Sequence, residues 1–176
     1  MDSRSFSKKV LRMVDVQTVS IAIASASIVV AAVYYILQIQ HQKKMRQTDL
    51  LMRLHLASST KEFVEAALKY LSTDYKDYDD FVEKYGSLIS EGQVQTVFVM
   101  MAVFFEGIGV LLKNKLVDID LVRELFAVEA IWLKLKPVAE GVRKQTNTAE
   151  VYEWFEYLYN EVKKREQKLQ AGVKVG

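Results

Sequence analysis

The sequence of 176 residues contains no cysteine, two histidines, one proline and seven glycines. The absence of cysteine excludes disulfide bonds, thiolate metal ligands and cysteine nucleophiles. The scarcity of proline and glycine argues against an all-β fold, because β-sandwiches and barrels need turn residues at regular spacing. Long stretches rich in Leu, Ala, Glu, Lys and Val therefore predict an all-α protein.

Charged residues are also missing from one long segment, residues 16–42. Within it, residues 19–37 are almost wholly apolar, and about 20 such residues in a helix cross the hydrocarbon core of a bilayer. We therefore expect a transmembrane helix over residues 18–38. A cleaved signal peptide and a buried helix are the alternatives. The apolar run continues well past the small-residue sites at 22–26, which favours an uncleaved anchor.

Basic residues flank this apolar run on both sides. A basic tail over residues 1–17 precedes it, and Lys43, Lys44 and Arg46 follow it. Positive charges favour the cytoplasmic side of a membrane, and the second group is the denser one. The sequence thus predicts a single-pass membrane protein with a cytoplasmic C-terminal domain. Residues 43–176 carry 20 basic and 20 acidic residues, so we expect no nucleic-acid partner.

The rest of the chain predicts helices separated by polar turns. A juxtamembrane helix over residues 39–57 continues from the membrane span. A helical bundle domain of about five to six helices occupies residues 58–168, its last helix covering 148–168. Residues 169–176 form a flexible tail. The predicted fold is therefore one N-terminal transmembrane helix that continues into a small helical bundle.

Local signals place the ends of several helices. Ser59, with a glutamate three residues later, predicts the start of a helix by a capping box. Gly86 predicts the end of a short helix, and Asp118 or Asp120 the start of another. Pro137 is expected to kink or split the helix that follows, because proline lacks the amide donor and crowds the preceding turn.

Residues 94–112 form the most apolar segment outside the anchor, with Glu106 as the single charge. A helix that is apolar all round is either a core helix or a second membrane span. A charge near mid-bilayer costs about 2.5–3.5 kcal/mol on insertion scales, so we favour a core helix. Gly107 and Gly109 are too few for a dinucleotide-binding loop, and we expect them to permit close helix–helix approach.

Glu106 is the one candidate site residue with a chemical argument. A buried carboxylate must find a partner or stay protonated, and the candidate partners are Arg53, Arg123 or backbone amides. The functional alternative is that Glu106, Gly107 and Gly109 contact a small apolar ligand, or that Glu106 senses protons.

No other group of residues predicts catalysis, a cofactor or a metal. The two histidines, His41 and His55, lie too far apart to form a zinc motif. Four aspartates resemble a calcium loop in charge but lack its glycine and glutamate: Asp74, Asp77, Asp79 and Asp80. The last helix carries five aromatic residues that serve the core or a partner surface: Tyr152, Trp154, Phe155, Tyr157 and Tyr159.

Three segments resemble an uncharacterised family of prokaryotic, notably archaeal, membrane proteins: residues 48–51 (TDLL), 104–112 (FFEGIGVLL) and 116–122 (LVDIDLV). The resemblance covers most of residues 18–165. It implies one N-terminal span followed by an α-helical domain of unknown function, and it implies no activity.

These observations predict a membrane-anchored helical protein-interaction module, an accessory subunit of a membrane complex, with no enzymatic activity. Its expected partners are the lipid bilayer and either another protein or a second copy of the chain. Pairs of small residues four apart in the span would allow such packing: Ser20 and Ala24, Ala22 and Ala26, and Ser27 and Ala31. The alternative is a membrane-tethered sensor that binds a small apolar ligand in the helical core near Glu106.

Overall fold

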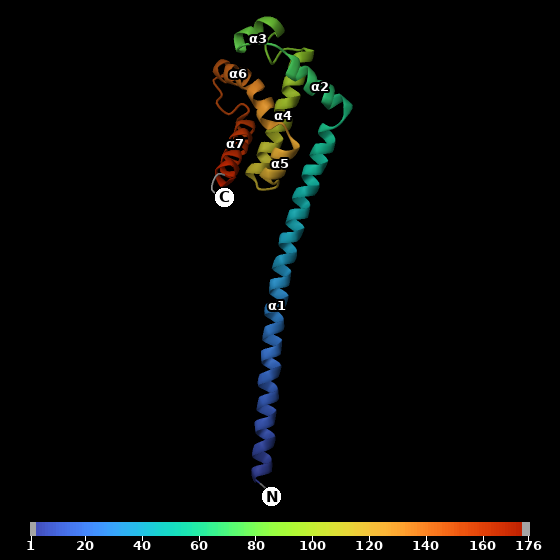
Figure 1. Cartoon of the computed structure of the whole chain (residues 1–176), viewed down its shortest axis with the longest axis vertical. Coiled ribbons are helices and arrows are strands. Elements are labelled where there is room, and N and C mark those ends of the chain that lie inside the picture. The colour runs from blue at the N-terminus through green and yellow to red at the C-terminus, as the bar shows by residue number, and fades with distance from the viewer. Residues whose placement is uncertain (1–2, 174–176) are drawn as a thin grey trace. The chain divides into compact units, whose positions relative to one another are not determined.

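The computed structural model describes residues 3–173, with side chains described for residues 16–171. Every regular element in these residues is an α-helix, which confirms the predicted all-α fold (Figure 1). The helices are α1 (Ser3–Ser58), α2 (Lys61–Ser72), α3 (Tyr78–Tyr85), α4 (Gln93–Lys113), α5 (Ile119–Leu125), α6 (Val128–Thr146) and α7 (Glu153–Val173). The chain divides into two compact units, residues 1–46 and 47–176.

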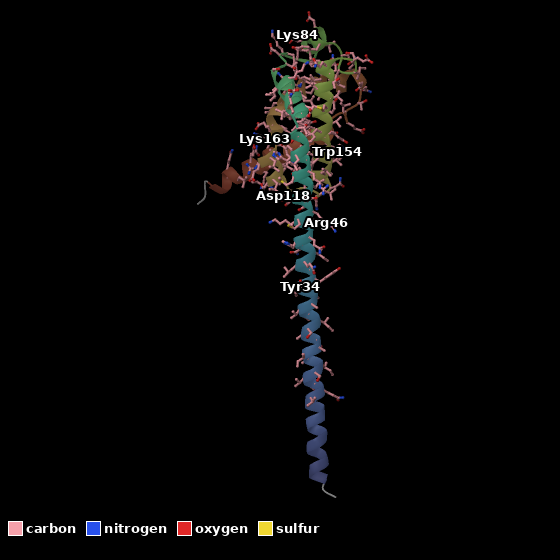
Figure 2. The ribbon with its side chains drawn as sticks, turned by 90° about the vertical axis from the view of Figure 1, so that its right-hand side faces the viewer. Tyr34, Arg46, Lys84, Asp118, Trp154 and Lys163 are labelled. Carbon is pink, nitrogen blue, oxygen red and sulfur yellow. The ribbon has the colours of Figure 1, made fainter. Side chains whose placement is uncertain are left out.

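The first unit consists of the N-terminal part of α1. Every described side chain from Val16 to Arg46 is exposed, and Figure 2 shows these side chains standing out from the ribbon. The hydroxyls of Ser20 and Ser27 donate to backbone carbonyls one turn earlier, both at 2.8 Å. The polar groups of these two serines are thus satisfied within the helix, as a lipid environment requires. The helix from Val16 is long and apolar enough to cross a membrane.

The predicted anchor and juxtamembrane helix both lie within α1, which ends at Ser58. From residue 3 onward, the backbone of the predicted basic tail belongs to the same helix. The side chains of residues 1–15 lie outside the described residues.

The second unit is a bundle arranged around α4, which packs against α2, α6 and α7 (Figure 1). One face of α4 is buried: Val97, Phe98, Met101, Ala102, Phe105, Ile108 and Gly109. The ring of Phe98 lies 4.5 Å from that of Tyr70 and 5.0 Å from that of Phe81. These contacts place α4 in the core, as the sequence predicted.

The residues that the sequence predicted to begin or end the short helices do so, except at the start of α2. Gly86 ends α3 at φ 86°, and Asp118 caps α5 by accepting from the amide of Asp120 at 2.9 Å, as expected. The cap of α2 is Thr60, whose Oγ1 accepts from the amide of Phe63 at 3.3 Å. The predicted cap Ser59 is wrong by one residue, because its hydroxyl donates back into α1.

Pro137 lies inside α6 and does not split it. The chain breaks earlier, at Phe126, whose backbone is extended with φ −128° and ψ 137°. The hydroxyls of Tyr70 and Tyr75 donate to the carbonyls of Ile131 and Lys134, in the turns before the proline. Side chains from α2 and the loop after it therefore bond to α6 in the turns before the proline.

The last helix also differs from its predicted bounds. A turn precedes Glu153, so α7 begins five residues later than expected. It continues to Val173, so residues 169–173 of the predicted tail are helical, and residues 174–176 lie outside the described residues. Three ion pairs connect α7 to its neighbours: Arg165–Asp120 at 2.7 Å, Lys163–Glu129 at 2.9 Å and Arg143–Glu156 at 2.7 Å.

Candidate binding cleft and the Glu106 contact

A cleft of about 840 Å³ lies between α3 and α6, which pack against each other in the bundle (Figure 1). Its wall on α3 includes Asp79, Val82 and Glu83, at helical spacing on one face. Its wall on α6 includes Pro137, Glu140, Gly141 and Lys144, which also lie at helical spacing on one face. This volume is within the range of small-molecule and peptide pockets.

Gly141 sets the distance between the two walls. A Cβ at this position would lie 2.0 Å from Cγ of Tyr78, so only glycine lets the tyrosine ring lie directly on α6. The hydroxyl of Tyr78 donates to Oε1 of Gln145 at 2.6 Å. Gly141 is therefore a close packing contact between α3 and α6.

The lining of the cleft contains four carboxylates and one ammonium group: Asp77, Asp79, Glu83, Glu140 and Lys144. Asp77 caps α3 by accepting from the amide of Asp80 at 2.9 Å. Glu140 lies 3.8 Å from Lys136. Asp79 and Glu83 are exposed and have no hydrogen-bond or ion-pair partner among the described residues.

Among the four aspartates that resemble a calcium loop in charge, Asp80 stabilises the start of α3. Oδ2 of Asp80 accepts from the amide of Lys76 at 2.9 Å and from the ammonium of Lys84 at 3.0 Å; Lys84 is labelled in Figure 2. The hydrogen bond from Lys84 lowers the pKa of Asp80. Among the described residues no group of three or more histidines and carboxylates could hold a metal ion.

The half-buried carboxylate of Glu106 lies at the first turn of α7. It accepts from the amide of Trp154 at 3.3 Å and from that of Phe155 at 2.7 Å; Trp154 is labelled in Figure 2. Burial raises the pKa of Glu106, whereas the two amide donors and the more distant Arg143 act to lower it. Glu106 of α4 thus acts as the N-terminal cap of α7.

The structure decides between the predicted partners of Glu106. Backbone amides are its partners, which was one of the predicted possibilities. The two predicted arginine partners are wrong: Nε of Arg53 pairs with Asp49 at 2.9 Å, and a guanidinium nitrogen of Arg123 lies 3.6 Å from Glu124.

Gly107 and Gly109, two residues apart on α4, differ in their surroundings. A Cβ at Gly109 would lie 2.0 Å from the carbonyl oxygen of Trp154, which confirms the expected close helix approach there. A Cβ at Gly107 would meet nothing within 4 Å, so the same expectation is wrong at Gly107. The backbone of α7 therefore fills the space beside Gly109, while Gly107 is exposed.

The aromatic residues of the last helix divide between core and surface. Phe155 is fully buried and stacks on Phe105 with ring centroids 4.8 Å apart. The rings of Trp154 and Tyr157 are partly exposed, and the ammonium of Lys113 lies 5.8 Å and 5.3 Å from their centroids.

Sequence reasoning missed the cleft. The only signal in the sequence was the helical spacing of Pro137, Glu140, Gly141 and Lys144. This spacing places the four residues on one face of a helix, but it does not predict which helix packs against that face. Nor do the histidines form a site. His41 is exposed, and the ring of His55 lies edge-on to Phe126 with centroids 6.1 Å apart.

Comparison with known proteins supports one part of the resemblance, that the chain belongs to an uncharacterised family. Residues 21–162 match the family described as a domain of unknown function, DUF4760. This range runs from the apolar part of α1 to the middle of α7. No curated protein and no solved structure matches the chain. Because the match covers most of the sequence, the chain belongs to the DUF4760 family, whose domain has no known function.

Proposed function

We propose that this protein is a membrane-anchored helical module that binds another protein, as an accessory subunit of a membrane complex. The observation that carries the proposal is the outer face of α4, which is apolar and uncovered by the rest of the bundle. No catalytic step is part of the proposal.

The outer face of α4 offers no polar side chain over several turns. Val99, Val103 and Val110 are 38%, 61% and 39% exposed, and Gly107 lies open among them. The single charge of this stretch, Glu106, is occupied by α7. A helix on the surface of a bundle normally carries polar residues on its outer face. A continuous exposed apolar surface is typical of a protein or membrane interaction site.

The apolar part of α1 supports the proposal that this interaction takes place at a membrane. Residues 16–42 carry no charge and none of their side chains is buried, so lipid is the environment that suits them. We propose a single membrane pass with the bundle on the cytoplasmic side, because Lys43, Lys44 and Arg46 follow the span closely. Protease treatment of sealed vesicles tests this orientation, and protection of the bundle in inside-out vesicles would contradict it.

The experiment compares two lysine substitutions at exposed apolar residues, Val103→Lys on α4 and Leu133→Lys on α6 (51% exposed). Native membranes are cross-linked and solubilised in mild detergent, and the mass of the purified complex is measured. We expect the wild type and Leu133→Lys to purify with a protein partner or a second copy, and Val103→Lys to lose it. A strictly monomeric wild type would contradict the proposal.

The geometry favours this function over a ligand sensor near Glu106. The backbone of Trp154 fills the space beside Gly109, and the carboxylate of Glu106 is already bonded to α7. A small apolar ligand at this position would have to displace α7 from α4.

A further inference from the structure

We propose that the cleft between α3 and α6 binds a lysine- or arginine-rich segment of the partner protein. This inference rests on the proposed protein-binding function, and it names the chemistry of one segment that is bound. The cleft is distinct from the outer face of α4, because none of its lining residues lies on that helix.

Charge complementarity is the first argument. Asp79 and Glu83 lie one turn apart on α3, are exposed, and have no ion-pair partner in the described part of the chain. Asp80, beside them in sequence, is paired with Lys84 at 3.0 Å. The two acidic residues of α3 that lack a partner thus both line the cleft. Carboxylates one helical turn apart repel each other, and cationic groups bound between them would relieve that repulsion.

The apolar part of the lining is the second argument. Val82, Pro137 and the ring of Tyr78 lie among the acidic residues. Lysine and arginine carry an aliphatic stem beneath a charged head. The stem can pack on the apolar residues while the charged head reaches the carboxylates. The exposed part of the Tyr78 ring adds a surface that attracts cations.

The arrangement of the carboxylates argues against other ligands. Within the described residues, no three acidic or histidine side chains converge closely enough to hold a metal ion. Four carboxylates against the single ammonium of Lys144 disfavour phosphate and nucleic acid. A cleft of about 840 Å³ also exceeds what one small cation fills. A peptide segment with spaced basic residues fits the size, the charge and the apolar lining together.

The test measures binding of a fluorescent eight-residue peptide of alternating lysine and alanine to the full chain in a neutral detergent. A second peptide has glutamate in place of lysine. The double variant Asp79→Asn/Glu83→Gln removes the two free carboxylates of the cleft. The control Glu91→Gln/Glu150→Gln removes the same charge from two exposed residues outside the cleft. Circular dichroism establishes that both variants are folded.

We expect the lysine peptide to bind the wild type, and the glutamate peptide not to bind. The cleft variant should weaken binding by about fivefold to tenfold, the effect of losing two exposed ion pairs, and the control variant should bind like the wild type. Absence of binding to the wild type, an equal loss in both variants, or no loss in the cleft variant would each overturn the proposal.

The outcome for the cleft can be separated from the outcome for the proposed function. If Val103→Lys abolishes co-purification while Asp79→Asn/Glu83→Gln leaves peptide binding unchanged, the cleft proposal fails and the interaction module stands. If the lysine peptide binds as expected but the wild type is monomeric in cross-linked membranes, the proposed function fails, although the cleft binds basic segments.

Discussion

α1 and α4 are both long and apolar enough to cross a membrane, but they differ in what surrounds them. From Val16 to Arg46, every side chain of α1 is exposed. In α4, Phe98, Met101 and Ile108 are at most 1% exposed, while Val103 is 61% exposed. Length and apolar composition therefore do not distinguish a membrane anchor from the central helix of a bundle.

The polar groups of the two helices distinguish them better. In α1, the hydroxyls of Ser20 and Ser27 bond to carbonyls of the same helix, so these side chains need no partner from outside. In α4, the carboxylate of Glu106 bonds to amides of α7. Hydroxyls that bond within their own helix, like those of Ser20 and Ser27, suit lipid, whereas Glu106 has its partners in another helix of the bundle.

The largest expected effect tests the buried face of α4. Phe98→Ala should lower the free energy of unfolding by about 3–5 kcal/mol, because it leaves a cavity among aromatic rings. Val103→Ala, on the exposed face of the same helix, should change it by less than about 0.5 kcal/mol. Denaturant titration of the full chain in detergent, followed by circular dichroism, measures both. Equal effects would mean that α4 has no distinct buried and exposed faces.

A charge in the middle of each helix tests which one lies in lipid. Ile28→Arg should disfavour membrane insertion by about 2.5–3.5 kcal/mol, and it should reduce the membrane-bound fraction after alkaline carbonate extraction. Val103→Arg places the same charge on α4 and should leave that fraction unchanged. If Val103→Arg releases the protein as Ile28→Arg does, α4 is a second span and the contrast between the helices fails.

The contact between α4 and α7 gives a smaller effect. Glu106→Ala leaves the amides of Trp154 and Phe155 without their acceptor, which should cost about 1–3 kcal/mol of folding free energy. Glu106→Gln keeps one acceptor oxygen and should cost less. Hydrogen exchange of these two amides should rise in the order wild type, Gln, Ala. Unchanged exchange in the alanine variant would show that Glu106 does not cap α7.

The ion pair between α5 and α7 gives the smallest effect, and it depends on pH. The hydrogen bond from Arg165 lowers the pKa of Asp120, so the folded state prefers the charged carboxylate. The stabilisation is present above the usual aspartate pKa and is lost as the pH falls through the lowered one. Thermal unfolding of Arg165→Gln should therefore depend less on pH in this acidic range. Lys168→Gln removes an exposed charge on the same helix that has no ion-pair partner among the described residues, and it should behave like the wild type.

The sequence predicted those features of the fold that depend on neighbouring residues. Gly86 ends α3 because it adopts a positive φ, and Asp118 starts α5 because its carboxylate accepts from the next turn. The end of α1 at Ser58 followed from the polar residues after it. Such signals are local, so one sequence contains them.

Features that depend on distant residues were missed or misplaced. Pro137 was expected to kink or split its helix, and it does not split it. The hydroxyls of Tyr70 and Tyr75 bond to carbonyls of α6 from about 60 positions away, which no local pattern predicts. No local signal marked the break at Phe126. The candidate sites show the same dependence on distant residues. The sequence indicated that Glu106 needs a partner. It did not indicate that α3 and α6 lie side by side and form a cleft.

The carboxylate that accepts from the first turn of α7 belongs to an earlier helix, α4, and this order has a consequence for how the protein is made. Glu106 precedes Phe155 by 49 positions, so α4 is synthesised before the first turn of α7. Starting a helix is its most costly step, and here the group that stabilises this step is already in place on the earlier helix. Nucleation of α7 and its docking onto α4 are therefore coupled, and a chain that stopped before Glu153 would leave the carboxylate without its two donors.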